Sequence, residues 1–176
     1  MPGPPPPGSD MAEFVEKRKK REEREGWIVA RGEMRIGSRE SPLVTVVGRG
    51  IAVCVWDRAR LVAGVAHFVE PATYDPAKAT CRYGNVAVPA LAAMMTKESA
   101  AALLEAHLFG GASLDSNDGT GHANAAMARK VLSNRGIPIV SEDVGESKGR
   151  KVMFDPATGH AAVLKVHSIR REDWGN

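Results

Sequence analysis

The sequence predicts one α+β (mixed α/β) domain in which β-sheets pack against helices. Short stretches rich in Val, Ile and Ala, bounded by Gly, Asp, Pro or Asn, are typical of strands. Two longer stretches carry apolar residues at helical spacing, and the second lies between two strand-like stretches, as in a βαβ unit. We expect the remaining strands to pair in antiparallel fashion. Elements that are apolar on one side bury that side against one another, which favours this layered class.

The length of 176 residues suits a single domain with a tail at each end. Residues 1–10 contain a run of prolines and cannot bury a core, and residues 12–25 are dominated by charges of both signs. We therefore predict a disordered tail over 1–25, a domain over 26–170 and a short C-terminal tail over 171–176. The charged run is also compatible with a docking arm, because basic runs can act as interaction tails.

The strands follow from apolar, β-branched runs that end at turn residues. A hairpin connection is expected at Asp57-Arg58-Ala59-Arg60, between two of these runs. The predicted strands cover 43–48, 51–57, 61–69, 105–112, 137–142, 150–155 and 160–166.

Two helices are expected from the spacing of their apolar residues. The first covers 84–104, with a break near Thr96-Lys97. The second covers 122–134. It is followed by a glycine, Gly136, and soon after by Pro138, and both residues are helix stop signals. This second helix connects strands 105–112 and 137–142, which could form one right-handed βαβ unit.

Composition narrows the class of protein. The formal charge of +3 and the small aromatic share give no reason to expect a nucleic-acid partner. Two cysteines do not make a disulfide framework, so we expect a reducing, cytoplasmic setting. We see no secretory signal, and no apolar run approaches the roughly 20 residues needed to span a bilayer, so membrane insertion is not expected.

One segment carries a recognisable motif. It runs from Leu43 to Asp57 and contains Thr45, then Gly48-Arg49-Gly50, then an apolar strand that ends in Trp56 and Asp57. This segment resembles the opening motif of the chemoreceptor glutamine deamidase family (CheD), which usually reads Thr, two apolar residues and Gly-Ser-Cys before the strand. The resemblance implies that a nucleophilic cysteine belongs at Gly50, and this chain has Arg49-Gly50 in place of the Ser-Cys pair.

His67 follows an apolar strand and precedes Pro71. On the residues alone, a single histidine there is more often structural. The resemblance implies that it matches the family's catalytic base, which activates the cysteine thiol for attack on a glutamine carboxamide and later protonates the departing ammonia. It also implies that Thr45 orients the histidine or the substrate, while an ordinary strand threonine remains the alternative.

Further blocks extend the resemblance over about residues 33–166. They are Tyr83–Leu91, Glu105–Ala112, Gly121–Asn124, Val144–Val152 and Thr158-Gly159. Two of the blocks depart from the family pattern, with Ala123 in place of an arginine and Glu146 in place of a glycine. The double glycine Gly110-Gly111 allows a tight turn or a close backbone approach. We predict that Arg49, Phe109, Gly110 and Gly111 contact a substrate or partner.

No other group is expected to replace the missing thiol. If residues 50–54 form one strand, Cys54 lies about 13 Å from position 50 at roughly 3.3 Å per residue, and a nucleophile must sit about 3 Å from its base. We therefore interpret Cys54 as a small buried hydrophobe, and no motif brings Cys81 to His67. We expect no metal site and no cofactor, because neither zinc-like spacing nor a phosphate loop is present.

Two functions remain open at this point. The resemblance implies a protein-glutamine glutaminase, an amidohydrolase, that acts on methyl-accepting chemoreceptors in chemotaxis. The absence of a thiol at Gly50 favours a pseudoenzyme, a binding module that docks chemoreceptors or a CheC-like phosphatase without hydrolysis. A third, weaker alternative is a diverged member with an unrelated ligand.

Overall fold

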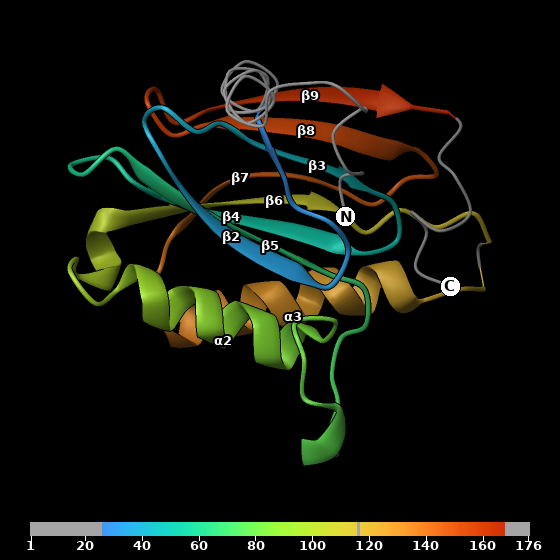
Figure 1. Cartoon of the computed structure of the whole chain (residues 1–176). Helices are drawn as coiled ribbons and strands as arrows, with labels where there is room; N and C mark the ends of the chain where they lie inside the picture. Colours follow the sequence, from blue (N-terminus) through green and yellow to red (C-terminus); the bar gives the residue numbers. More distant parts are fainter. Residues whose placement is uncertain (1–25, 116, 168–176) are drawn as a thin grey trace, which may run out of the picture.

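The computed structural model of the chain describes residues 26–115 and 117–167, which form three stacked layers. A four-stranded sheet lies on a five-stranded sheet, and two α-helices cover the other side of the five-stranded sheet (Figure 1). The α+β class is confirmed. The tails predicted over 1–25 and 171–176 lie outside the described residues, so the predicted domain boundaries stay predictions.

The five-stranded sheet forms the middle layer, with the strand order β2-β5-β4-β6-β7. Its central strand β4 is buried at every position, because a sheet covers one face and the helices cover the other. The predicted turn after β4 is present, and the Asp57 carboxylate accepts hydrogen bonds from the backbone N–H groups of Ala59 and Arg60. The strands are β2 (Glu33–Ser38), β4 (Ile51–Asp57), β5 (Val62–Phe68), β6 (Leu104–Gly110) and β7 (Ile139–Val144).

The four-stranded sheet forms the outer layer, with the order β1-β3-β8-β9. Its strands are β1 (Trp27–Ile28), β3 (Leu43–Val47), β8 (Gly149–Asp155) and β9 (His160–Val166). β6 and β7 pair in parallel, as the predicted βαβ unit requires. The expectation that all other strands are antiparallel is wrong at one place, because β1 pairs with β3 in parallel. A two-residue strand leaves too short a pattern to be recognised in the sequence.

The helices are α2 (Gly84–Met95) and α3 (Thr120–Asn134). The expected continuation of the first helix to residue 104 is wrong, and only the break near Thr96 is confirmed. The Thr96 hydroxyl donates to the carbonyl of Ala92, so it competes for a backbone acceptor of the last turn. Leu104 instead starts β6.

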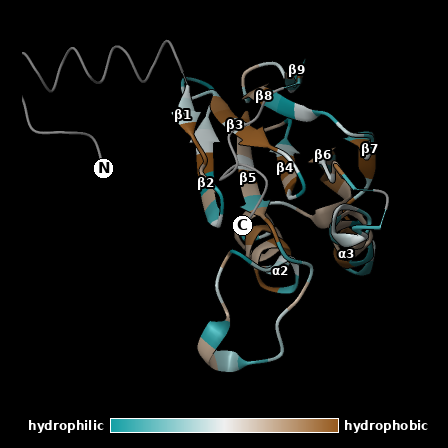
Figure 2. Cartoon of the chain, turned by 90° about the vertical axis from the view of Figure 1, so that its right-hand side faces the viewer, coloured by the Kyte–Doolittle hydropathy of each residue, from teal (hydrophilic) through white to brown (hydrophobic). Residues whose placement is uncertain are grey.

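Two apolar clusters hold the layers together. One lies between the five-stranded sheet and the helices and includes Phe68 and Leu91, and the other lies between the two sheets and includes Cys54 and Phe109. The strands around β3 and β4 are among the most hydrophobic parts of the chain (Figure 2). Alternate side chains of one strand supply both clusters, as the two-residue period of a strand requires. No helix in the described part of the chain is long and apolar enough to cross a membrane.

Candidate active site

The connection between β3 and β4 crosses from one sheet to the other and brings Gly50 to the end of β5. An ideal Cβ built on Gly50 would lie 3.1 Å from Nε2 of His67. Position 50 and His67 are thus direct neighbours, so a reactive group carried by a side chain at position 50 would lie within reach of the imidazole. The structure brings together the residues that the resemblance paired.

His67 is held by Thr45, which lies on the facing sheet. The Thr45 hydroxyl donates to the carbonyl oxygen of Val29 at 2.8 Å, and Nδ1 of His67 lies 3.0 Å from the same hydroxyl oxygen. A threonine hydroxyl has one hydrogen, and Val29 accepts it. Nδ1 therefore carries the proton and donates to Thr45, which leaves a lone pair on Nε2.

This lone pair has no hydrogen-bond partner in the part of the chain that the structure describes. His67 is 1% exposed. Burial, with the nearby positive charge of Arg31 as a smaller cause, lowers the pKa of His67 from 6.5 to about 4. The ring is therefore neutral at pH 7 and can accept a proton at Nε2.

The space at position 50 is closed. A Cβ there would lie 2.4 Å from the backbone carbonyl oxygen of Phe68 and 3.1 Å from a methyl carbon of Val69. The first distance is shorter than a van der Waals contact, and a strand carbonyl cannot rotate away as a side chain can. Position 50 therefore lacks both a thiol and the room for any side chain without a shift of the backbone.

The turn after β6 is hydrogen-bonded to the connection between β3 and β4, which contains Gly50. The N–H groups of Gly111 and Ala112 donate to the carbonyls of Gly50 and Gly48 at 2.7 and 3.0 Å. A Cβ on Gly110 would lie 2.3 Å from the oxygen of Gly50, so the close backbone approach expected of the double glycine is confirmed. Phe109 is 3% exposed in the core between the sheets. In this arrangement Phe109, Gly110 and Gly111 support the connection, and their contact with a partner stays a prediction.

Asn124 also fixes the connection that contains Gly50, and it was not predicted as a site residue from the sequence. Its side-chain amide donates to the carbonyls of Arg49 and Val69 at 3.1 and 3.0 Å, and the residue is fully buried in the first turns of α3. Asn124 thereby joins the connection before β4 to the segment after β5. The signal for it was present in the sequence, because it occupies the Asn position of the family block at Gly121–Asn124.

Arg49 points away from the lone pair of His67 toward the loop before α3. Its guanidinium lies 3.0 Å from the Asp118 carboxylate, and its side chain is 23% exposed. Hydrogen bonds from Thr120, and then from Arg49, lower the pKa of Asp118 to about 2. The Arg49 charge is thus paired with Asp118 within the chain, while part of the side chain reaches the surface.

Glu146 has a backbone conformation that favours glycine. Its φ is 59°, in the left-handed region that favours glycine, and it follows Gly145 at φ 86°. The carbonyl of Glu146 accepts from the N–H of Ser113, and its carboxylate lies 2.9 Å from Nζ of Lys165. The departure from the family pattern therefore places a strained residue in a turn that contacts the segment after β6.

The cysteines lie outside this arrangement. Cys54 is fully buried between the sheets, which confirms its interpretation as a small hydrophobe, and burial raises the pKa of its thiol. Cys81 is half-buried before α2 and packs against the cluster under the helices. Within the described residues, no three His, Cys, Asp or Glu side chains gather in a way that could hold a metal ion.

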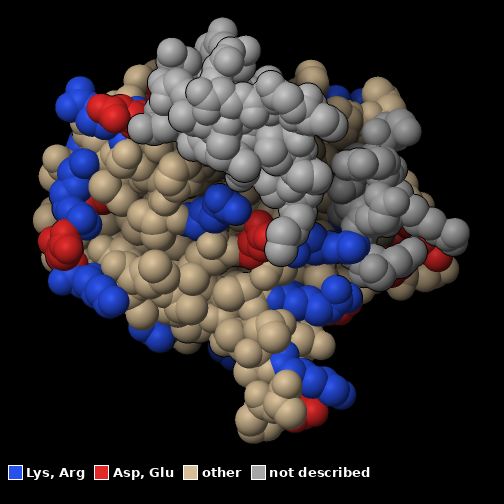
Figure 3. Space-filling view, in the orientation of Figure 1, with Lys and Arg blue, Asp and Glu red and all other residues tan. Residues whose placement is uncertain are grey.

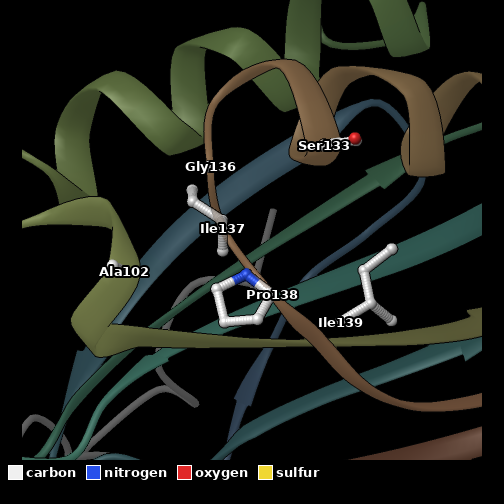
Figure 4. Close-up of a pocket in the computed structure, with 6 residues that line it drawn as sticks. All are labelled: Ala102, Ser133, Gly136, Ile137, Pro138 and Ile139. Carbon is white, nitrogen blue, oxygen red and sulfur yellow. The ribbon is translucent and has the colours of Figure 1, made fainter.

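A hollow of about 450 Å³ lies at a different place in the fold (Figure 4). It is lined by Ala102, Ser133, Gly136, Ile137, Pro138 and Ile139. These residues surround the C-terminal end of α3, whereas Asn124 and the site lie near its N-terminal end, about 15 Å apart over ten residues at about 1.5 Å per residue. The hollow therefore does not belong to the site of His67.

Comparisons with known proteins identify the family of the chain. The family model described as CheD chemotactic sensory transduction matches residues 70–165. The chain is 34% identical over 140 residues to a probable chemoreceptor glutamine deamidase CheD 1 of Anaeromyxobacter dehalogenans, covering 77% of this chain and 81% of that protein. It is 36% identical over 149 residues to a probable chemoreceptor glutamine deamidase CheD of Zymomonas mobilis, covering 81% of each chain.

The two kinds of match cover different parts of the site. The family model begins at Glu70, after both Gly50 and His67. The match to the Anaeromyxobacter protein covers 77% of a chain of 176 residues, so it cannot begin after Leu43 and it includes both positions. Relatives of more than 30% identity thus match 77% and 81% of this chain, and the chain belongs to the CheD family of chemotactic sensory transduction proteins.

Proposed function

We propose that this chain binds the chemoreceptor region that its relatives are named for deamidating, and that it does so without hydrolysing glutamine. The observation that carries the proposal is that a buried base lies next to a position that has no side chain. The Nε2 lone pair of His67 faces Gly50, which has no side chain.

Hydrolysis of a carboxamide by covalent catalysis needs a nucleophile about 3 Å from its base. The backbone carbonyl of Phe68 occupies the space that a side chain at position 50 would take. Cys54 is buried between the sheets and its pKa is raised, which disfavours the thiolate. The described residues therefore offer His67 no thiol to activate.

The surface beside the site suits a protein partner. Arg49 is partly exposed there and Asp118 lies against it. Arg49 and Asp118 thus place charges of both signs beside the site, and the face shown in Figure 3 likewise carries Lys and Arg together with Asp and Glu. A mixed pattern of this kind favours selective protein contacts. We place this role in the cytoplasm, where the two thiols would stay reduced.

Residual amidohydrolase activity is the second candidate function. The observation that favours it is the intact Thr45–His67 pair, with the ring neutral and its lone pair directed at position 50. A base kept in this state without a reaction to catalyse needs another explanation, such as support of the fold.

Titration calorimetry and mass spectrometry on glutamine-containing receptor fragments distinguish the two candidates. We expect binding without ammonia release and without the roughly one-dalton shift of Gln to Glu that amide hydrolysis produces. A relative that carries the family's cysteine serves as the positive control. A shift produced by the unaltered chain would overturn the proposal and establish the second candidate.

The contact surface is tested with a matched pair of variants. Arg49→Glu reverses the charge beside the site, and Arg58→Glu makes the same change beyond the opposite end of β4, roughly 20 Å away. We expect Arg49→Glu to weaken binding about tenfold and Arg58→Glu to leave it unchanged. A parallel titration with a CheC-like phosphatase tests the alternative partner, and binding to it alone would move the proposal from the receptor to that phosphatase.

A further inference from the structure

Strand β9 forms one edge of the outer sheet. It spans seven residues, His160–Val166, and pairs only with β8 among the strands that the structure describes. One side of its backbone therefore presents N–H and C=O groups that can accept another strand. Figure 1 shows β9 as the outermost described strand of its sheet.

The other sheet edges in the described ranges carry features that discourage pairing. β1 has only two residues. β2 carries Glu33 and Arg35, and β7 carries Glu142 and Asp143. Very short edge strands and charged side chains are the usual protection of an edge. β9 is longer than β1 and carries fewer charged side chains than β2 or β7.

The side chains of β9 are apolar on both faces of the sheet. Leu164 is 62% exposed on the outer face and pairs in register with Lys151, and the neighbouring Met153 is 37% exposed beside Ala162. Val163 lies in register with the buried Val152 and is 36% exposed on the inner face. An edge of this kind, long and apolar, is a site where a further strand is expected.

Lys165 is the charged side chain that could have protected this edge. Its ammonium instead lies 2.9 Å from the Glu146 carboxylate and 3.7 Å from that of Asp143. Its charge is thus paired with carboxylates of the same chain at the surface.

We propose that β9 pairs in antiparallel fashion with β9 of a second copy of this chain, about a twofold axis at Val163. This register pairs all seven residues of the strand. It places Ala162 opposite Leu164 on the outer face and Ala161 opposite Lys165 on the inner face. Val163 lies opposite its own copy.

The charges of the strand support a second copy as the occupant. In this register each Lys165 faces an alanine and the two lysines lie far apart, so no like charges are opposed. Each His160 faces Val166. The same sequence therefore complements itself under the twofold symmetry that most homodimers use.

The pairing leaves the candidate active site open. β8 lies between β9 and β3, the strand of Thr45, so the new contact is about two strand spacings, roughly 10 Å, from that strand. The pairing would join two four-stranded sheets into one continuous sheet. It is independent of whether the chain hydrolyses glutamine.

Cysteine crosslinking tests the register in a Cys81→Ser background, because Cys54 is fully buried. We expect Val163→Cys to give a disulfide-linked dimer under mild oxidation, because position 163 lies opposite itself. The matched control is His160→Cys, whose two copies would lie roughly 20 Å apart along the strand and should not crosslink. Equal crosslinking at both positions, or none at 163, would overturn the proposal.

Sedimentation of the unmodified full chain tests the association itself. We expect a monomer–dimer equilibrium whose dissociation constant rises about tenfold or more in Val163→Lys, which opposes two like charges. Met94→Lys introduces the same charge on an exposed position of α2 and should leave the constant unchanged. A chain that stays monomeric at high concentration would refute the proposal, as would dimerisation seen only after removal of residues 168–176, which would show that this segment occupies the edge.

Discussion

The two halves of the candidate site have different fates in this chain. On the side of the base, Thr45 accepts Nδ1–H of His67, which leaves the Nε2 lone pair facing Gly50. On the side of the nucleophile, Gly50 offers no side chain and the carbonyl of Phe68 fills the space. The surroundings of His67 are therefore complete although position 50 carries no reactive group. The hydrogen bond of His67 to Thr45 also joins the two sheets, whereas a side chain at position 50 would overlap the Phe68 carbonyl.

The largest effect is expected from returning the motif to the family's form. Arg49→Ser with Gly50→Cys should destabilise the domain by about 3 kcal/mol, because the new Cβ overlaps the Phe68 carbonyl. Deamidation should stay near zero, since displacement of a reacting group by about 1 Å can cost on the order of a hundredfold. Urea unfolding and mass spectrometry of a receptor fragment measure the two quantities.

Gly50→Ala is the control for that experiment. It introduces the same Cβ without a thiol, so it should lose the same stability. If the cysteine variant instead gains strong activity at unchanged stability, the end of β5 moves freely and the crowding has no consequence.

The second largest effect is a dependence of the free energy of unfolding on pH, which arises from His67. The folded chain holds the pKa of His67 at about 4, against 6.5 in the unfolded chain. Between these values the unfolded chain binds a proton that the folded chain does not, so this contribution is complete above pH 6.5 and is lost as the pH falls toward 4. The loss amounts to at most about 3 kcal/mol. Unfolding free energies of the wild type and of His67→Gln, measured over this range, should diverge accordingly, and parallel curves would contradict the burial of a neutral ring.

A smaller effect is expected at the hydroxyl that orients the base. Thr45→Val keeps the shape but removes the acceptor for Nδ1–H and the donor to Val29, which should cost about 2 kcal/mol. Thr45→Ser keeps the hydroxyl and should recover most of that loss. The losses are measured by urea unfolding, and a Thr45→Ser loss as large as that of Thr45→Val would contradict a dominant role of the hydroxyl.

The smallest effect is expected at a departure from the family pattern outside the site. Glu146→Gly relieves a positive φ and loses an exposed ion pair to Lys165, so a net gain of about 1 kcal/mol is expected. Glu146→Ala loses the ion pair and keeps the strain, and should gain nothing. If the glycine variant unfolds at the same temperature as the wild type, the turn is not strained.

The sequence predicted the strands with strong local patterns and missed those without them. β4 and β9 have the expected bounds, because each is an apolar run between turn residues. β2 was missed although Glu33–Ile36 alternate charged and apolar residues, because this pattern is short and stops at Gly37. The end of α2 was placed too late, because apolar residues beyond Thr96 belong to the next strand.

The candidate site likewise contains features that no local sequence pattern predicts. The pairing of Thr45 with His67, which lie 22 positions apart and on different sheets, came from the resemblance to a family and not from any local pattern. The overlap at Gly50 depends on where a carbonyl of another strand lies, to a fraction of an ångström. Nothing in the spacing of residue types carries that information, and the same holds for the hydrogen bonds of Asn124 to two carbonyls.

The carbonyl of Phe68 has a consequence for the history and the engineering of this chain. Because that oxygen would lie 2.4 Å from a Cβ at position 50, a cysteine introduced at codon 50 alone meets a filled space. This first step toward a thiol is unfavourable unless the end of β5 shifts as well. Selection for renewed deamidation should therefore yield changes near Phe68 and Val69 before, or together with, a cysteine at position 50.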